Sequence, residues 1–138
     1  MTGKERVLSA IRREAVDRIP WVPFVGCHGG ALIGQTATNY LKSADLLVQG
    51  VGKAIELYQP DGIPVVFDLQ IEAEVLGCQL NWADETPPAV CSHPLAQGMS
   101  LDQMTVPGSG DGRIPAVLEA TQRLRRAHPE VALYGLIL

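Results

Sequence analysis

The sequence predicts an α/β fold in which parallel strands alternate with helices. Two amphipathic helical patterns, over residues 43–60 and 115–128, are each followed by a short apolar run, over residues 63–67 and 131–138. Apolar residues on consecutive positions are typical of a strand that is covered on both faces, as in a parallel sheet. A chain that alternates strands and helices in this order favours the parallel connections of α/β proteins.

The composition argues against several classes of protein. With 46% hydrophobic and 19% charged residues, the 138-residue chain is long and apolar enough to fold around a core. The net charge of −4 and the scattered basic residues argue against a nucleic-acid partner. No apolar run reaches the roughly 18 residues of a membrane span. Three widely spaced cysteines favour a reducing, cytoplasmic location over a disulfide framework.

A helix is predicted at the N-terminus, and a first strand after it. Thr2 begins a capping-box pattern, which predicts a helix over about residues 2–14. The apolar run over residues 21–25 predicts the first strand. The glycine-rich segment 26–30 follows, and its spacing matches neither the P-loop nor the dinucleotide-binding fingerprint. We therefore interpret it as a loop that needs positive φ angles.

The middle of the chain contains the clearest helical pattern and the second predicted strand. Ser43 is the expected N-cap of a helix that ends near Pro60 and carries a broad apolar stripe. After a turn, residues 63–67 form the second strand, which ends at Asp68.

The last part of the chain predicts an excursion, a helix and a third strand. Residues 72–77 form a short helical piece, and the alternating pattern over residues 78–90 predicts a β-hairpin outside the main sheet. Residues 99–112 are loop-like. Residues 115–128 form a helix whose first turn suits its proline, and the run 131–138 is the last strand.

Several stretches together resemble the uroporphyrinogen decarboxylase superfamily. The similar segments are Lys4–Arg13, Val16–Pro20, Asp61–Asp68, Glu72–Gly77, Pro87–Pro88 and the helix that follows Arg113. No single segment is specific, but their order and spacing are. The resemblance implies the N-terminal portion of a (β/α)8 TIM barrel, with about three βα units plus a β-hairpin excursion.

Three strands cannot close a barrel, and a complete one usually needs about 250 residues. We therefore expect residues 1–138 to form a single partial domain, incomplete as given and inactive by itself. The chain stops within an apolar run, which would leave an edge strand exposed. We expect self-association through this edge, near Val131–Leu138.

The superfamily contains two chemically different branches. Uroporphyrinogen decarboxylases, which are lyases of porphyrin biosynthesis, remove acetate carboxylates from a tetrapyrrole without a cofactor. Their relatives are corrinoid-dependent methyltransferases, in which a zinc-bound thiolate accepts the methyl group. The decarboxylases hold substrate carboxylates with arginines that follow the first strand, whereas residues 26–34 contain none. The resemblance thus favours the methyltransferase branch; a divergent decarboxylase and a non-catalytic binding or scaffold module remain alternatives.

The resemblance also implies how the functional groups are distributed. The zinc ligands of the methyltransferases lie in their C-terminal half, so we expect no metal or cofactor site in this segment. Zinc and a corrinoid are expected in the full-length protein, with the corrinoid or a small molecule as its substrate. Cys27 and His28 are adjacent, and adjacent residues rarely bind one metal ion with good geometry.

Asp68 is the strongest candidate for a catalytic residue. It ends a predicted barrel strand, and such barrels keep their chemistry at the carboxyl ends of the strands. The resemblance implies that its carboxylate stabilises charge at the substrate; the alternative is a cap on the next turn. We also expect His28, Gly29 and Phe67 to bind substrate, although a plain loop histidine is the simpler interpretation of His28.

Two further carboxylates follow Asp68 closely. Glu72 and Glu74 could form an acid–base pair, but solvated charges on a helix explain them more simply.

Overall fold

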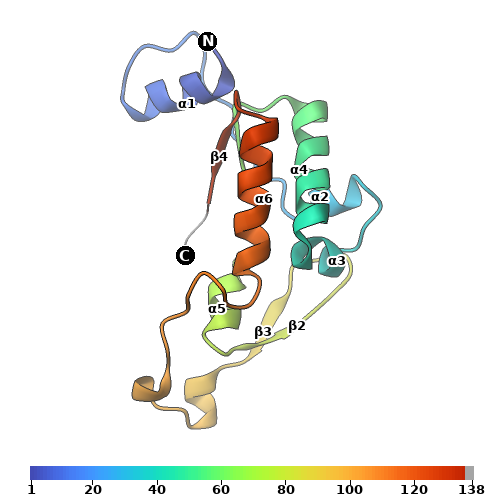
Figure 1. Ribbon diagram of the computed structural model, residues 1–138, viewed down its shortest axis with the longest axis vertical. Helices are drawn as coiled ribbons and strands as arrows, with labels where there is room; N and C mark the ends of the chain where they lie inside the picture. The colour runs from blue at the N-terminus through green and yellow to red at the C-terminus, as the bar shows by residue number, and fades with distance from the viewer. Residues whose placement is uncertain (136–138) are drawn as a thin grey trace.

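The computed structural model describes residues 1–135. Figure 1 shows α1 at one end of the molecule, the β2–β3 hairpin toward the other, and α4 and α6 side by side between them. The α-helices are α1 (Gly3–Ile11), α2 (His28–Ala31), α3 (Ala37–Lys42), α4 (Ala44–Tyr58), α5 (Ile71–Val75) and α6 (Ile114–Ala127). The strands are β1 (Gly62–Pro64), β2 (Gln79–Asn81), β3 (Ala89–Ser92) and β4 (Ala132–Tyr134), with 3-10 turns η1 (Pro94–Gln97) and η2 (Leu101–Gln103).

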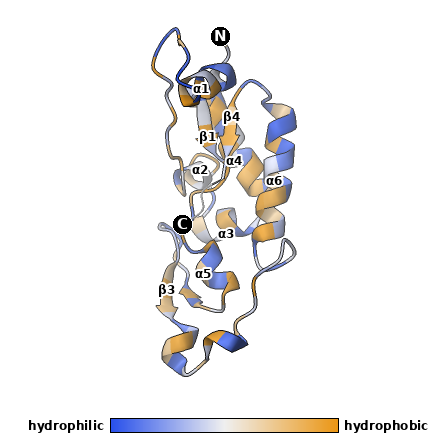
Figure 2. Cartoon of the chain, turned by 90° about the vertical axis from the view of Figure 1, so that its left-hand side faces the viewer, coloured by the Kyte–Doolittle hydropathy of each residue, from blue (hydrophilic) through white to orange (hydrophobic). Residues whose placement is uncertain are grey.

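The main sheet consists of two parallel strands, β1 and β4. Gly62 lies opposite Ala132 and Pro64 opposite Tyr134, and the two strands run side by side in Figure 2. The chain passes from β1 through α5, the hairpin and α6 before it returns in β4. This parallel pairing through an intervening helix confirms the predicted α/β class.

The apolar core lies between this sheet and the two long helices. Leu47, Val51 and Ala54 of α4 are buried against Leu124 of α6 and Ile63 of β1. Figure 2 shows α6 carrying both hydrophobic and hydrophilic residues, as expected for a helix with one buried face. The predicted apolar stripe of the 43–60 helix is therefore confirmed as a core surface.

Both predicted helix starts are confirmed by their caps. The Thr2 side chain accepts a hydrogen bond from the Glu5 backbone N–H, and the Glu5 carboxylate accepts one from Thr2. The Ser43 hydroxyl accepts a hydrogen bond from Leu46 N–H at 3.3 Å. However, α1 is shorter than the predicted 2–14, because Arg13 adopts a left-handed conformation with φ of 60°.

The predicted first strand, over residues 21–25, is wrong as a strand. This segment is extended, and Trp21 exchanges hydrogen bonds with Asp61 beside β1, but no regular ladder follows. Pro20 and Pro23 have no backbone N–H to donate, so they weaken any ladder in this segment. At the other end, β4 covers residues 132–134, while 136–138 of the predicted last strand lie outside the described residues.

The predicted hairpin is confirmed as an antiparallel pair, β2–β3, with a register shift between Gln79 and Leu80. It is attached to the rest of the chain through the segment that follows β2. The Thr38 hydroxyl donates to Ala83 O at 2.9 Å, and the Ala37 N–H donates to Asp84 O at 2.7 Å. Among residues 1–135, no helix is both long and apolar enough to cross a membrane.

The glycine-rich segment is only partly a positive-φ loop. Gly26 has a φ of 52°, as predicted, but Gly29 lies within the short helix α2 and does not. A Cβ atom on Gly29 would lie 2.5 Å from the Tyr40 hydroxyl, and one on Gly50 of α4 would lie 2.5 Å from Gly29 O. At Gly29 the missing side chain therefore permits close packing of α2 against α3 and α4.

Candidate functional site

A largely buried cluster of ion-paired residues lies after the carboxyl end of β1. The strand leads through Val65 and Val66 into Phe67 and Asp68, whose side chain is 0% exposed. Arg113 Nη1 lies 2.5 Å from Asp68 Oδ2, and the Arg113 side chain is 8% exposed. The segment that precedes α6 thus supplies a cation to the carboxylate that follows β1.

Both oxygens of Asp68 are engaged within the chain. Besides the pair with Arg113, Asp68 Oδ1 accepts a hydrogen bond from the Gln70 backbone N–H at 3.0 Å. The capping contact that we considered as the alternative for Asp68 is therefore present. A catalytic role for Asp68 stays a prediction.

Arg113 makes several further contacts. Its Nε lies 2.6 Å from Glu74 Oε2, its Nη1 donates to Leu41 O at 3.3 Å, and its Cζ lies 4.8 Å from the centroid of the Trp82 ring. Glu74 is thus an ion-pair partner, rather than the solvated helix charge that we considered the simpler explanation. Buried Nη2 has no hydrogen-bond partner among residues 1–135.

Sequence reasoning missed Arg113 as part of the site. It precedes a proline-started helix, where an arginine carries no sign that its side chain will be buried. Its partners lie 45 and 39 residues away in the chain, at Asp68 and Glu74. A buried charge needs a partner, but the sequence does not indicate which arginine is buried.

The predicted substrate-binding residues are placed in three different surroundings. Phe67 stacks on Phe24 with ring centroids 4.7 Å apart, and Phe24 is 60% exposed. Gly29 is buried beneath Tyr40. His28 is exposed, and its Nε2 lies 2.8 Å from the hydroxyl of Tyr58 at the end of α4. Of the three, Phe67 is next to Asp68 and carries an exposed aromatic partner.

Cys27 is half-buried close to this cluster. Burial raises the pKa of its thiol, and the nearby carboxylate of Asp68 raises that pKa further. Burial also raises the pKa of Tyr40, and the proximity of Cys27 adds to that effect. A thiol with a raised pKa is a poor nucleophile and a poor metal ligand, because both roles need the thiolate. No group of three or more His, Cys, Asp or Glu side chains in the described range could hold a metal ion.

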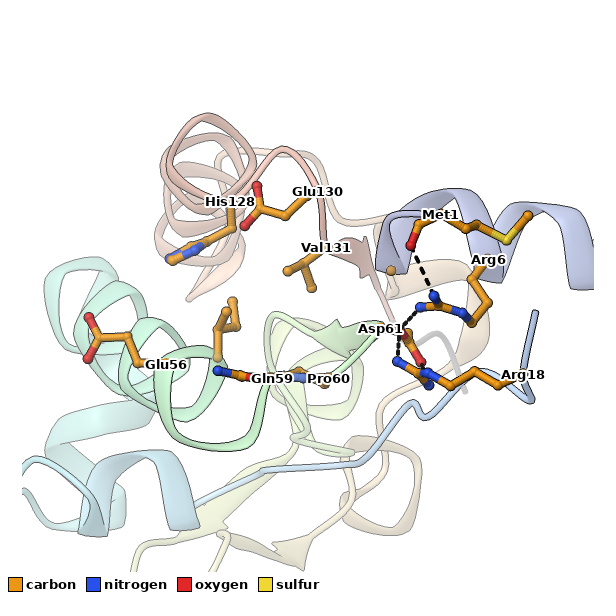
Figure 3. A pocket seen from close by; sticks show the side chains of 12 residues that line it. Met1, Arg6, Arg18, Glu56, Gln59, Pro60, Asp61, His128, Glu130 and Val131 are labelled. Carbon is orange, nitrogen blue, oxygen red and sulfur yellow. Dashed lines mark hydrogen bonds and ion pairs between the residues drawn. The ribbon is translucent and has the colours of Figure 1, made fainter. Parts of the chain in front are cut away.

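A second charged cluster lies at the opposite end, before β1. Arg6 pairs with Asp17 at 2.6 Å and also with Asp61, while Arg18 Nη1 lies 2.5 Å from Asp61. Figure 3 shows Arg6 and Arg18 converging on Asp61 beside a hollow of about 520 Å³. This network ties α1 to the start of the sheet, and it uses residues from the family-like segments at the N-terminus.

The fold and the cluster of Asp68, Arg113 and Glu74 define an α/β protein with ion-paired polar residues directly after the carboxyl end of a parallel strand. The chain belongs to the uroporphyrinogen decarboxylase (URO-D) family, because the model of that family matches residues 2–138.

Similar proteins place the chain closer to one branch of this family. It is 29% identical to a methylcobamide:CoM methyltransferase (MtbA) of Methanosarcina mazei, over 89% of this chain and 38% of that protein. It is 29% identical to a methylated-thiol–coenzyme M methyltransferase of the same organism, over 93% of this chain and 35% of that protein. A solved methyltransferase from Methanosarcina mazei superposes with a TM-score of 0.84 at 27% identity, over 98% of this chain and 42% of that one.

The chain therefore spans about two fifths of the length of these relatives. The predicted leaning toward the methyltransferase branch agrees with all of these comparisons.

Proposed function

We propose that the whole protein transfers a methyl group from a corrinoid to a thiol, and that this chain forms the N-terminal part of its (β/α)8 barrel. The observation that carries the proposal is that, within residues 1–135, the arginine that contacts the carboxylate at the carboxyl end of β1 is buried and ion-paired within the chain. Residues 26–34 contain no arginine, and the guanidinium that contacts Asp68 is buried and engaged. A substrate with many carboxylates would find no bidentate partner there.

The aromatic pair next to Asp68 suits the flat face of a large ring. Phe24 and Phe67 are stacked, and Phe24 presents an exposed aromatic surface. Ligand pockets are lined mainly by hydrophobic and aromatic side chains, with a few polar groups that fix orientation. We propose that this pair packs against the corrinoid ring, while Asp68 provides a fixed negative charge close by.

The two groups that the methyltransferase branch uses fit this chain differently. When bound, the corrinoid would supply the methyl group to the thiol, which would give up its proton, and Phe24, Phe67 and Asp68 are the residues of this chain that we propose would lie against it. We propose that zinc is bound by the remainder of the whole protein, because the resemblance places the zinc ligands of the methyltransferase branch in the C-terminal half. The contribution of this chain is to bind and orient.

The proposal is tested with methylcobalamin as donor and coenzyme M as acceptor. The whole protein is incubated with both, and the methylated thiol is quantified by mass spectrometry. We expect methylated coenzyme M that depends on the protein and on methylcobalamin.

A matched pair of variants separates ligand binding from folding. Phe24→Ala removes an exposed aromatic surface, so we expect weaker methylcobalamin binding with a native circular dichroism spectrum. Trp21→Ala removes another exposed aromatic residue of the same segment, outside the stacked pair, and serves as the control. Consumption of uroporphyrinogen without methyl transfer would instead identify a divergent decarboxylase. If the protein binds methylcobalamin but shows neither methyl transfer nor decarboxylation, a non-catalytic binding module is favoured.

A further inference from the structure

Arg113 contacts two parts of the chain that lie far apart in the sequence. Its Nη1 is paired with Asp68, which follows β1, and its Cζ lies over the ring of Trp82, which follows β2. Trp82 also has Lys42 Nζ over its ring, 3.9 Å from the centroid. In Figure 1 the start of α6, α5 and the hairpin lie toward the same end of the molecule.

The buried pair of Arg113 and Asp68 is not explained by stability alone. Burying two charges has a high desolvation cost, and an apolar pair of similar volume is often as stable or more stable. Arg113 Nη2 is buried and lacks an acceptor among residues 1–135, which adds a further cost. What the ion pair does provide is geometry, because a planar guanidinium holds its acceptors in fixed directions.

Each contact of Arg113 fixes a different neighbour. Nε donates to Glu74 on α5, Nη1 donates to Asp68 and to the carbonyl of Leu41, and Cζ lies over the Trp82 ring. If the guanidinium shifts, its contacts with Asp68 and with Trp82 must change at the same time. The carboxylate and the hairpin are therefore linked through one rigid group.

We propose that Arg113 is a positioning residue: it fixes the carboxylate of Asp68 and couples that carboxylate to the β2–β3 hairpin through Trp82. The inference deepens the proposed function, on which the importance of Asp68 rests. Functional groups need support from neighbours whose own geometry is fixed, and Arg113 supplies this support from two sides.

The test uses Trp82 as a reporter of a change made at Asp68. The chain has two tryptophans, so Trp21→Phe leaves Trp82 as the single emitter. In this background we expect Asp68→Asn to shift the Trp82 emission, because the change at Asp68 alters the position of Arg113, one of the two cations over the Trp82 ring. With Arg113→Lys already present, Asp68→Asn should add no further shift.

The control lies on α6, the helix that begins directly after Arg113. Arg123 forms exposed ion pairs with Asp45 and Glu119, so Arg123→Lys should leave the Trp82 emission unchanged. Circular dichroism verifies the fold of each variant. If Asp68→Asn does not fold, Asp68→Glu keeps the charge, displaces the carboxylate by one methylene group, and completes the same cycle.

Two results would overturn the coupling. One is a folded Asp68 variant with unchanged Trp82 emission; the other is an equal shift with and without Arg113→Lys. In the methyl-transfer assay we expect Arg113→Lys to lower kcat while the KM for methylcobalamin stays unchanged, and an unchanged kcat would contradict the positioning role. Absence of methyl transfer by the unaltered protein, combined with a non-additive Trp82 cycle, would refute the proposed function and leave the coupling intact.

Discussion

The thiol of Cys27 shows how one buried carboxylate changes the chemistry of its surroundings. Burial, and then the charge of Asp68, raise the pKa of this thiol above its ordinary value. Near neutral pH the group therefore stays protonated and reacts slowly, because the thiolate is the reactive form. The raised pKa also disfavours metal binding by Cys27 together with His28, because a cysteine binds a metal ion as the thiolate.

This leads to a prediction about alkylation. In a Cys78→Ser background at pH 8, we expect iodoacetamide to modify Cys27 more slowly than Cys91, which is exposed on β3. Asp68→Asn removes the nearby negative charge and should accelerate reaction at Cys27, while the rate at Cys91 is unchanged. Mass spectrometry of the two peptides gives both rates. Equal rates at Cys27 with and without the Asp68 charge would contradict the electrostatic explanation.

Helix α4 contains two glycines with different surroundings: Gly50 is tightly packed, and Gly52 has room for a Cβ atom. A Cβ atom on Gly50 would lie 2.5 Å from Gly29 O and 2.6 Å from the Tyr40 ring, so α2 and α3 leave no room for it. A Cβ atom on Gly52 would meet only His128 Nε2, at 3.7 Å. The same substitution should therefore act in opposite directions two residues apart.

We expect Gly50→Ala to lower the free energy of unfolding by about 1–3 kcal/mol, because the overpacking exceeds the gain in helix propensity. Gly52→Ala should raise it by up to about 1 kcal/mol, since alanine favours a helix interior and an ordinary contact is formed. Urea unfolding followed by circular dichroism measures both. Stabilisation by Gly50→Ala would show that α2 does not pack closely on α4.

The stability of the whole fold is expected to depend on pH through the ion-pair network of Arg6, Arg18, Asp17 and Asp61. Burial acts to raise the pKa of Asp61, but the backbone N–H of Trp21 and the guanidinium groups of Arg18 and Arg6 together hold it below its usual range. The hydrogen bond from Arg6 likewise lowers the pKa of Asp17. Both groups stabilise the fold fully above the ordinary aspartate value of about 3.9, and this contribution is lost as the pH falls below it.

We therefore expect the free energy of unfolding to fall between pH 5 and pH 2. Asp61→Asn should reduce stability at pH 7 by about 2 kcal/mol, because it removes the buried carboxylate that Arg6 and Arg18 share, and should flatten the acid dependence. Asp45→Asn removes the exposed partner of Arg123 and should change little at either pH. An acid dependence that is identical with and without the Asp61 charge would place its origin elsewhere.

Features that depend on a local pattern of residues can be predicted without the structure. The capping box at Thr2, the cap at Ser43, the apolar stripe of α4 and the alternation of the hairpin each follow from spacing within a few residues. The order of family-like segments placed the chain in its family, and the absence of arginine in residues 26–34 indicated the branch.

Which side chains are in contact depends on the tertiary structure. The 21–25 segment is extended as its pattern suggested, but a ladder needs a backbone N–H donor that Pro23 lacks. The pairing of Arg113 with Asp68, and the use of Gly29 for packing rather than for a positive φ, depend on contacts between residues far apart in the chain. Such contacts leave no periodic signal, because burial of a charge or loss of a Cβ is set by the neighbour that folding brings close.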